Sequence, residues 1–143
     1  MKKFTLTSAI IVIMVSLFSI TASCKKEKEI KTTVSNSTKV EVYYFHFTRR
    51  CVTCQAVETE SKKAIASLYP AQSKKGLITY KSVNLDEKGT EALAKKCNAE
   101  GQALLVISGN KRMDLTDKGF MYGLNSPEKL KAELKKVIDP LMR

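Results

Sequence analysis

The sequence predicts a single α/β domain over residues 39–143, with a central sheet flanked by helices. Two observations carry this prediction. Stretches with the apolar pattern of strands alternate with stretches of helical periodicity, in the order β-α-β-α-β-β-α. Two of the strands are almost uniformly apolar, which is typical of strands that are buried on both faces of a sheet. The stretch is long enough for one hydrophobic core and too short for two, so we expect one domain.

The strands are recognised by their β-branched and aromatic residues. Residues 39–47 (KVEVYYFHF) are too uniformly apolar at their end for a strand with one exposed face, so we expect a central strand. Residues 77–85 (LITYKSVNL) alternate and indicate a second strand. Ala103–Ser108 (ALLVIS) is a further buried strand, and residues 109–110 (Gly-Asn) predict a turn into the last strand at residues 111–116.

Three helices are expected between and after these strands. Residues 54–68 place apolar side chains at three- and four-residue spacing, and Pro70 follows the predicted end. Residues 87–97 form a second, short helix. Ser126 and Pro127 mark the start of the third, as a capping residue and a proline at the first helical position. Its apolar face is formed by Leu130, Leu134, Val137, Ile138 and Leu141.

The first 23 residues resemble a bacterial lipoprotein signal peptide. Lys2 and Lys3 precede 20 uncharged residues, and small residues stand directly before Cys24, although Thr21 replaces the usual larger aliphatic residue. The resemblance makes Cys24 the lipidated first residue of the mature chain. An ordinary signal peptide and an uncleaved anchor helix are the alternatives, the latter weakened by seven Ser and Thr residues in the uncharged stretch. In each case the domain lies outside the cytoplasm, where disulfides persist.

Residues 25–38 are predicted to be a flexible tether, because they bury too little apolar area to offset the loss of chain entropy. The chain has a formal net charge of +11, and residues 39–143 contain 19 Lys and Arg against 12 Asp and Glu. The Lys residues are spread through helices that also carry Glu, which indicates a solvated basic surface rather than a nucleic-acid interface. We therefore expect a monomer in the bacterial cell envelope that binds no nucleic acid. It would contact the membrane through the lipid on Cys24 and face the periplasm or the cell exterior.

Cys51 and Cys54 lie where the first strand is predicted to end and the first helix to begin. A helix start places Cys51 next to unpaired backbone N–H groups and the positive end of the helix dipole, which stabilise a thiolate. Cys54 comes round the first turn and lies close enough to form a short disulfide. Arg49 and Arg50 directly precede the pair and add positive charge. The spacing therefore indicates a redox pair, with a structural disulfide or a zinc half-site as the alternatives.

His46 and Cys97 each admit two interpretations. His46 is either a core histidine with satisfied ring nitrogens, or a proton acceptor or metal ligand near Cys54. Cys97 is either a small buried apolar residue or a third thiol within reach of the redox pair. A metal site, if present, would use Cys51, Cys54 and His46.

From residue 39 to its C-terminal end the chain resembles the thioredoxin superfamily, in the order strand, Cys-x-x-Cys, helix, strand, helix, β-hairpin, helix. The segment from Tyr44 to Cys54 (YFHFTRRCVTC) is similar to small exported bacterial thioredoxin-like lipoproteins of the nitrophilin type. The resemblance implies that Cys51 is the exposed attacking thiol and Cys54 the buried resolving thiol. It also implies an α/β fold of three layers, with a central mixed sheet flanked by helices, and no organic cofactor.

Several positions depart from the pattern of thioredoxins proper. Arg50 stands in place of the Trp before the first cysteine, and Val52 and Thr53 replace the Gly-Pro between the two. Phe45 occupies the position of the buried acid. Gln102 aligns with the cis-proline, which in that family shapes the substrate groove and keeps metals away from the thiols. The residues expected to tune the redox pair are therefore Arg49, Arg50, His46 and Gln102.

These observations together predict a membrane-tethered thiol–disulfide oxidoreductase that acts on protein disulfides or thiols outside the cytoplasm through Cys51 and Cys54. The alternative is a zinc- or copper-binding or redox-silent thioredoxin-like module. A third possibility is a structural lipoprotein in which the pair is an inert clamp.

Overall fold

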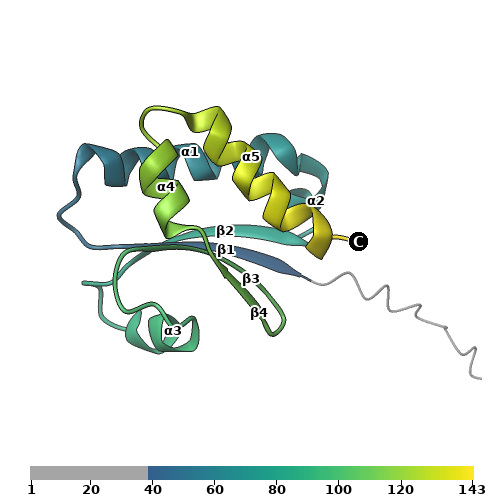
Figure 1. The fold of residues 1–143 in the computed structure, drawn as a ribbon. Helices are drawn as coiled ribbons and strands as arrows, with labels where there is room; N and C mark the ends of the chain where they lie inside the picture. The colour runs from purple at the N-terminus through teal and green to yellow at the C-terminus, as the bar shows by residue number, and fades with distance from the viewer. Residues whose placement is uncertain (1–38) are drawn as a thin grey trace, which may run out of the picture. The chain divides into compact units, whose positions relative to one another are not determined.

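A four-stranded sheet in the order β2-β1-β3-β4 forms the centre of the fold, as shown by a computed structural model that describes residues 39–143 (Figure 1). The predictions for the signal segment, for Cys24 and for the tether lie outside these residues. The elements in chain order are β1 Val40–His46, α1 Val52–Leu68, α2 Pro70–Lys74, β2 Ile78–Asn84, α3 Glu91–Lys96, β3 Ala103–Ser108, β4 Lys111–Asp114, α4 Thr116–Tyr122, α5 Pro127–Ile138 and the 3₁₀ turn η1 Asp139–Leu141.

β1 is the central strand, as its sequence predicts. It pairs in parallel with β2, with Val40 opposite Ile78, and antiparallel with β3, with Tyr44 opposite Leu104. β4 forms an antiparallel hairpin with β3 at the other edge. Helices α1, α2, α4 and α5 cover one face of the sheet and α3 covers the other (Figure 1). The predicted α/β class, with a central mixed sheet flanked by helices in three layers, is confirmed, and the strands occur in the predicted order.

The side chains of β1 alternate between two hydrophobic clusters, one on each face of the sheet. Val42 and Tyr44 belong to the cluster beneath α1 and α5, together with Leu104, whereas Tyr43 and Phe45 belong to the cluster beneath α3. Because both faces are covered, successive side chains of β1 are buried, which explains its nearly continuous apolar sequence.

Two helix boundaries differ from those predicted. Pro70 does not simply follow the first helix but begins α2, since a proline is tolerated at the first helical position, where its missing N–H has no partner to lose. The second predicted helix, at residues 87–97, begins only at Glu91. The residues before it form a turn that includes Gly89 at φ +93°, a backbone conformation that favours glycine.

The C-terminal part contains one helix that the sequence analysis missed and one cap that it misassigned. Helix α4 follows β4 where only a strand was expected. The Ser126 side chain makes no capping hydrogen bond, and its backbone carbonyl instead accepts from Lys129 N at 2.8 Å. Leu141 is buried as predicted but lies in η1, because α5 ends before Pro140. None of the helices within residues 39–143 is long and apolar enough to cross a membrane.

Helix α4 lies directly against the first turns of α1 because two glycines permit a close approach. A Cβ atom on Gly119 would lie 3.0 Å from Val57 Cγ1, and one on Gly123 would lie 3.0 Å from Val57 Cγ2. These contacts are tighter than ordinary van der Waals separations, so larger side chains would force the two helices apart. Val57 is one turn beyond Cys54, and α4 therefore supports the part of α1 that carries the cysteine pair.

Candidate functional site

Cys51 and Cys54 are joined in a disulfide at the start of α1, with their Cα atoms 5.1 Å apart. Cys51 is the N-cap residue, in an extended conformation (φ −76°, ψ 167°) that lets the chain turn from the loop after β1 into the helix. Its sulfur accepts a hydrogen bond from Cys54 N at 3.2 Å, and its carbonyl accepts from Gln55 N at 3.1 Å. A backbone N–H with no partner within the helix therefore points at the position where a Cys51 thiolate would form.

The two sulfur-bearing residues differ in exposure. Cys51 is exposed, and Val52 beside it is 70% exposed, whereas Cys54 is only 4% exposed. Another protein can therefore reach the disulfide from the Cys51 side. Cys54 is positioned to react with the sulfur of Cys51 rather than with an external partner.

Tyr44 connects the sheet to the first turn of α1. Its hydroxyl donates a hydrogen bond to the backbone carbonyl of Cys54 at 2.9 Å, and its side chain is fully buried. Burial raises the pKa of Tyr44 to about 12, with a further contribution from the Glu58 carboxylate. The hydroxyl thus remains a donor at neutral pH and fixes the first turn of α1 to β1.

Gln102, in the loop before β3, lies beside Cys54. Its side-chain oxygen Oε1 is 3.7 Å from Cys54 Sγ, and no peptide bond within residues 39–143 is cis. A disulfide sulfur has no proton to donate, so in the oxidised protein this is a contact rather than a hydrogen bond. In the reduced protein the Cys54 thiol can donate to the amide oxygen.

The two arginines before the pair have different environments. Arg49 is exposed, whereas the guanidinium of Arg50 forms an ion pair with the Glu58 carboxylate on α1. Burial opposes the ionisation of Glu58, but a hydrogen bond from Ser82 and the charge of Arg50 outweigh it and lower its pKa. Glu58 was not predicted as a site residue, although its position four residues after Cys54 places both on the same side of a helix.

His46 has the surroundings of a core histidine. It is 7% exposed, its Nδ1 lies 3.0 Å from the carbonyl oxygen of Phe47, and its ring centroid is 5.8 Å from that of Tyr44. Throughout residues 39–143, no three His, Cys, Asp or Glu side chains are grouped so that they could hold a metal ion. The structure therefore does not bring His46 together with Cys51 and Cys54 as a three-ligand site.

Cys97 is a free thiol on the other side of the sheet. It is 3% exposed and belongs to the cluster of Tyr43 and Phe45 beneath α3, whereas α1 covers the opposite face (Figure 1). Burial is the main cause that raises the pKa of the Cys97 thiol. The sheet separates this protonated thiol from the cysteine pair.

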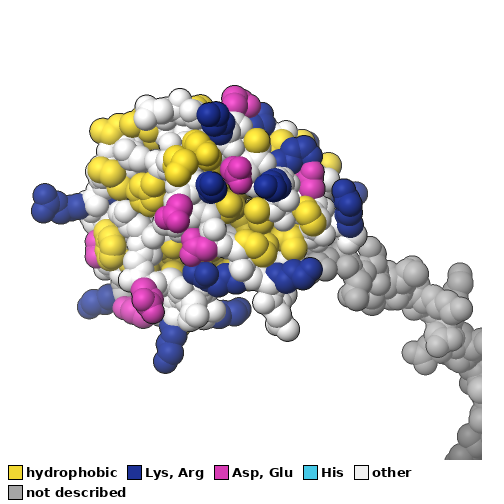
Figure 2. Space-filling view, viewed as in Figure 1, with side chains coloured by type: hydrophobic (Ala, Val, Ile, Leu, Met, Phe, Trp, Pro, Cys, Tyr) yellow, Lys and Arg dark blue, Asp and Glu magenta, His cyan; other side chains and the backbone are white. Residues whose placement is uncertain are grey.

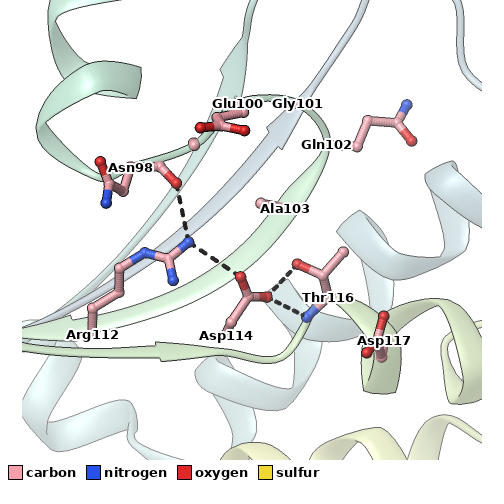
Figure 3. Close-up of a pocket in the computed structure, with 10 residues that line it drawn as sticks. Asn98, Glu100, Gly101, Gln102, Ala103, Arg112, Asp114, Thr116 and Asp117 are labelled. Atoms are coloured by element: carbon pink, nitrogen blue, oxygen red, sulfur yellow. Dashed lines mark hydrogen bonds and ion pairs between the residues drawn. The ribbon is translucent and has the colours of Figure 1, made fainter.

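A polar pocket of about 370 Å³ begins at Gln102 and extends along the loop before β3 (Figure 3). Arg112 donates to the carbonyl of Asn98 and to the Asp114 carboxylate, both at 3.1 Å. Asp114 in turn accepts from Thr116 N at 3.0 Å and Thr116 Oγ1 at 2.5 Å. Figure 3 shows this network on one side of the pocket and Gln102 on the other. The network ties the loop that carries Gln102 to β4 and α4.

This network of Arg112, Asp114 and Thr116 was not predicted from the sequence. Asp114 and Thr116 are two residues apart, the spacing at which an Asp side chain accepts a hydrogen bond from the backbone of its own turn. This spacing was the signal in the sequence that could have indicated the network. The contribution of Arg112 depends on the β3–β4 hairpin, which carries it back to the end of α3. On the face shown in Figure 2, Lys and Arg side chains are scattered among acidic and apolar ones, without a continuous basic patch.

No family model and no curated protein matches this chain. Among solved structures, the chain is similar to one titled "Structure of a malarial protein". The two are 23% identical with a TM-score of 0.44, over 69% of this chain and 97% of the other.

Proposed function

We propose that this protein is a thiol–disulfide oxidoreductase of the thioredoxin-like superfamily, acting on protein thiols or disulfides through Cys51 and Cys54. One observation carries the proposal: an exposed cysteine caps the start of a helix and is bonded to a buried cysteine one turn later. An inert structural disulfide needs no such difference in exposure. The backbone N–H of Cys54 and the helix dipole favour negative charge on Cys51, which is the chemistry of an attacking thiolate.

The reaction is an exchange of disulfide bonds. The Cys51 thiolate attacks one sulfur of a substrate disulfide, so that a mixed disulfide forms and the other substrate sulfur leaves as a thiolate, which takes up a proton. The Cys54 thiol then loses its proton to solvent and attacks the sulfur of Cys51. This step restores the Cys51–Cys54 disulfide and releases the substrate as a dithiol. Two electrons pass from the domain to the substrate, and a thiol-containing donor protein must return them; the reverse sequence oxidises a substrate dithiol.

The acidity of Cys51 tests this proposal. In the reduced domain we expect Cys51 to titrate below about 7, since thiols at helix starts in Cys-x-x-Cys motifs fall to roughly 3.5–7.5 from about 8.5. Alkylation at neutral pH should be faster at Cys51 than at Cys54 or Cys97. The measurement is the rate of alkylation across pH, with each site assigned by mass spectrometry. A Cys51 that titrates like a free thiol, with no preference over Cys54, would leave the structural disulfide as the better account.

We further propose that the domain is held at a membrane of the bacterial cell envelope through a lipid on Cys24. The support is the charge pattern of the first 23 residues and the small residues before this cysteine. The Cys24→Ser variant should carry no lipid and should move from the membrane to the soluble fraction, as measured by lipid labelling and fractionation. Cys97→Ala is the matched control and should stay lipidated. Unchanged labelling and retention in Cys24→Ser would exclude Cys24 as the anchor.

A further inference from the structure

Glu58 and Arg50 form a half-buried ion pair that links the segment before Cys51 to α1. The Arg50 guanidinium contacts the Glu58 carboxylate, and the two side chains are 27% and 26% exposed. Arg50 is the immediate neighbour of Cys51, and Glu58 lies one helical turn beyond Cys54. The ion pair therefore joins the residue before Cys51 to the second turn of α1, and its charges are partly buried, so that salt screens them less than it screens surface charges.

The surroundings keep both partners charged at neutral pH. An arginine guanidinium keeps its positive charge in proteins. Burial opposes the ionisation of Glu58, but the hydrogen bond from Ser82 and the neighbouring positive charge hold its pKa below the usual value. The ionisable and polar groups that face the pair are Tyr44 and His46 from β1, and Tyr80 and Ser82 from β2.

The two charges act on the first turn of α1 in opposite directions. The pKa of Tyr44, whose hydroxyl contacts the Cys54 carbonyl, is raised by Glu58 and lowered by Arg50. A negative charge disfavours the ionisation of any acid nearby, and a positive charge favours it. The same signs apply to the thiol of Cys51. The carboxylate thus offsets the positive charge that the sequence places directly before Cys51.

We propose that Glu58 is a positioning residue that sets the acidity of Cys51 and the reduction potential of the disulfide by holding and offsetting the charge of Arg50. The inference rests on the proposed oxidoreductase function and deepens it. Without the carboxylate, an uncompensated guanidinium would stabilise the Cys51 thiolate. The reduced form would be favoured, and the domain would become a stronger oxidant. Without the guanidinium, an uncompensated carboxylate would have the opposite effect.

The test is a charge cycle at these two positions in the full chain. Glu58→Gln should lower the pKa of Cys51 by about 0.5–1 unit, and Arg50→Gln should raise it by a similar amount. The double variant should lie near the wild type, because both charges are gone. In the equilibrium with glutathione the potentials should shift by roughly 15–30 mV, upward for Glu58→Gln and downward for Arg50→Gln, since tenfold corresponds to about 30 mV.

Two further variants separate charge from structure. Glu60→Gln removes a carboxylate two residues along α1, one that is paired with Lys63 at 2.8 Å, and it should leave the pKa of Cys51 unchanged. Arg50→Lys keeps the charge and should stay close to the wild-type value. Urea unfolding of every variant shows whether the domain has remained folded before its thiols are titrated.

The outcomes of the charge cycle distinguish failure of this inference from failure of the proposed function. Opposite shifts in the two single variants support the inference, because the loss of a purely structural clamp would move both in the same direction. If the pKa of Cys51 shifts in the same direction in both single variants, or in neither, the inference is overturned. The proposed function still stands in that case, provided that wild-type Cys51 is acidic and exchanges disulfides. Wild-type Cys51 titrating as a free thiol would overturn both, and this result would be seen before any variant is made.

Discussion

Cys51→Ser is expected to lower the rate of thiol–disulfide exchange by at least about a thousandfold, to the level of the reaction without protein. The serine hydroxyl remains protonated at neutral pH and cannot form a disulfide, so neither the attack nor the mixed disulfide is possible. The fold should be unaffected, because the residue is an exposed N-cap and serine is among the preferred residues there. The measurement is insulin reduction, followed by turbidity with dithiothreitol as the electron donor.

Cys54→Ser should give a different result, because it leaves the attacking thiol in place. Under the proposed function the buried Cys54 acts only on the sulfur of Cys51, so its loss should trap the mixed disulfide with the substrate as a one-to-one adduct visible by mass spectrometry. Cys97→Ala is the control and should retain exchange, since its thiol lies in the cluster beneath α3. Full turnover by Cys54→Ser, or loss of exchange in Cys97→Ala, would contradict the assignment of roles.

The strands and the order of the elements could be predicted because their signals are local. β1 and β3 are short, apolar and bounded by polar or turn residues, and this pattern is sufficient to mark buried strands. Helix α4 has no comparable signal. Its seven residues include Gly119, and Gly123 follows directly, so its local helix propensity is low. The glycines are explained only by the contact with Val57 of α1, which sequence reasoning cannot see.

The cysteine pair could be predicted because its signal is also local: both residues lie within one helical turn. Glu58 could not be paired with Arg50 without knowing how the chain turns between β1 and α1, although its spacing from Cys54 was informative. The alternation along β1 was also informative but incomplete. It places His46 on the same face as Tyr44, yet only the position of α3 shows that Cys97 lies with Tyr43 beneath the other face.

Leu104→Ala should lower the free energy of unfolding by about 2–5 kcal/mol, the usual cost of emptying a buried leucine site. Leu104 is fully buried in β3, two residues after Gln102. Its side chain also lies against α4, because a Cβ atom on Gly119 would be 3.3 Å from Leu104 Cδ2. Domains of this size are stable by only about 5–15 kcal/mol, so the loss should be visible in urea unfolding as a large fall in the midpoint.

The backbone of Leu104 makes the result informative about the site as well as the core. Its N–H donates to Thr116 Oγ1 at 3.0 Å, and its carbonyl accepts from Leu115 N at 2.8 Å, so the start of α4 is anchored to β3 at this residue. Met121 lies on α4, the helix that Leu104 contacts, but its side chain is 58% exposed. Met121→Ala is therefore the matched control and should change the free energy of unfolding by no more than about 0.5 kcal/mol. If α4 supports the first turns of α1, Leu104→Ala should also reduce the preference for alkylation at Cys51 over Cys54, because the resolving thiol becomes more accessible. An equal loss of stability in Leu104→Ala and Met121→Ala would mean that the core is not centred on β3. Unchanged alkylation selectivity in Leu104→Ala would mean that α4 does not support the first turns of α1.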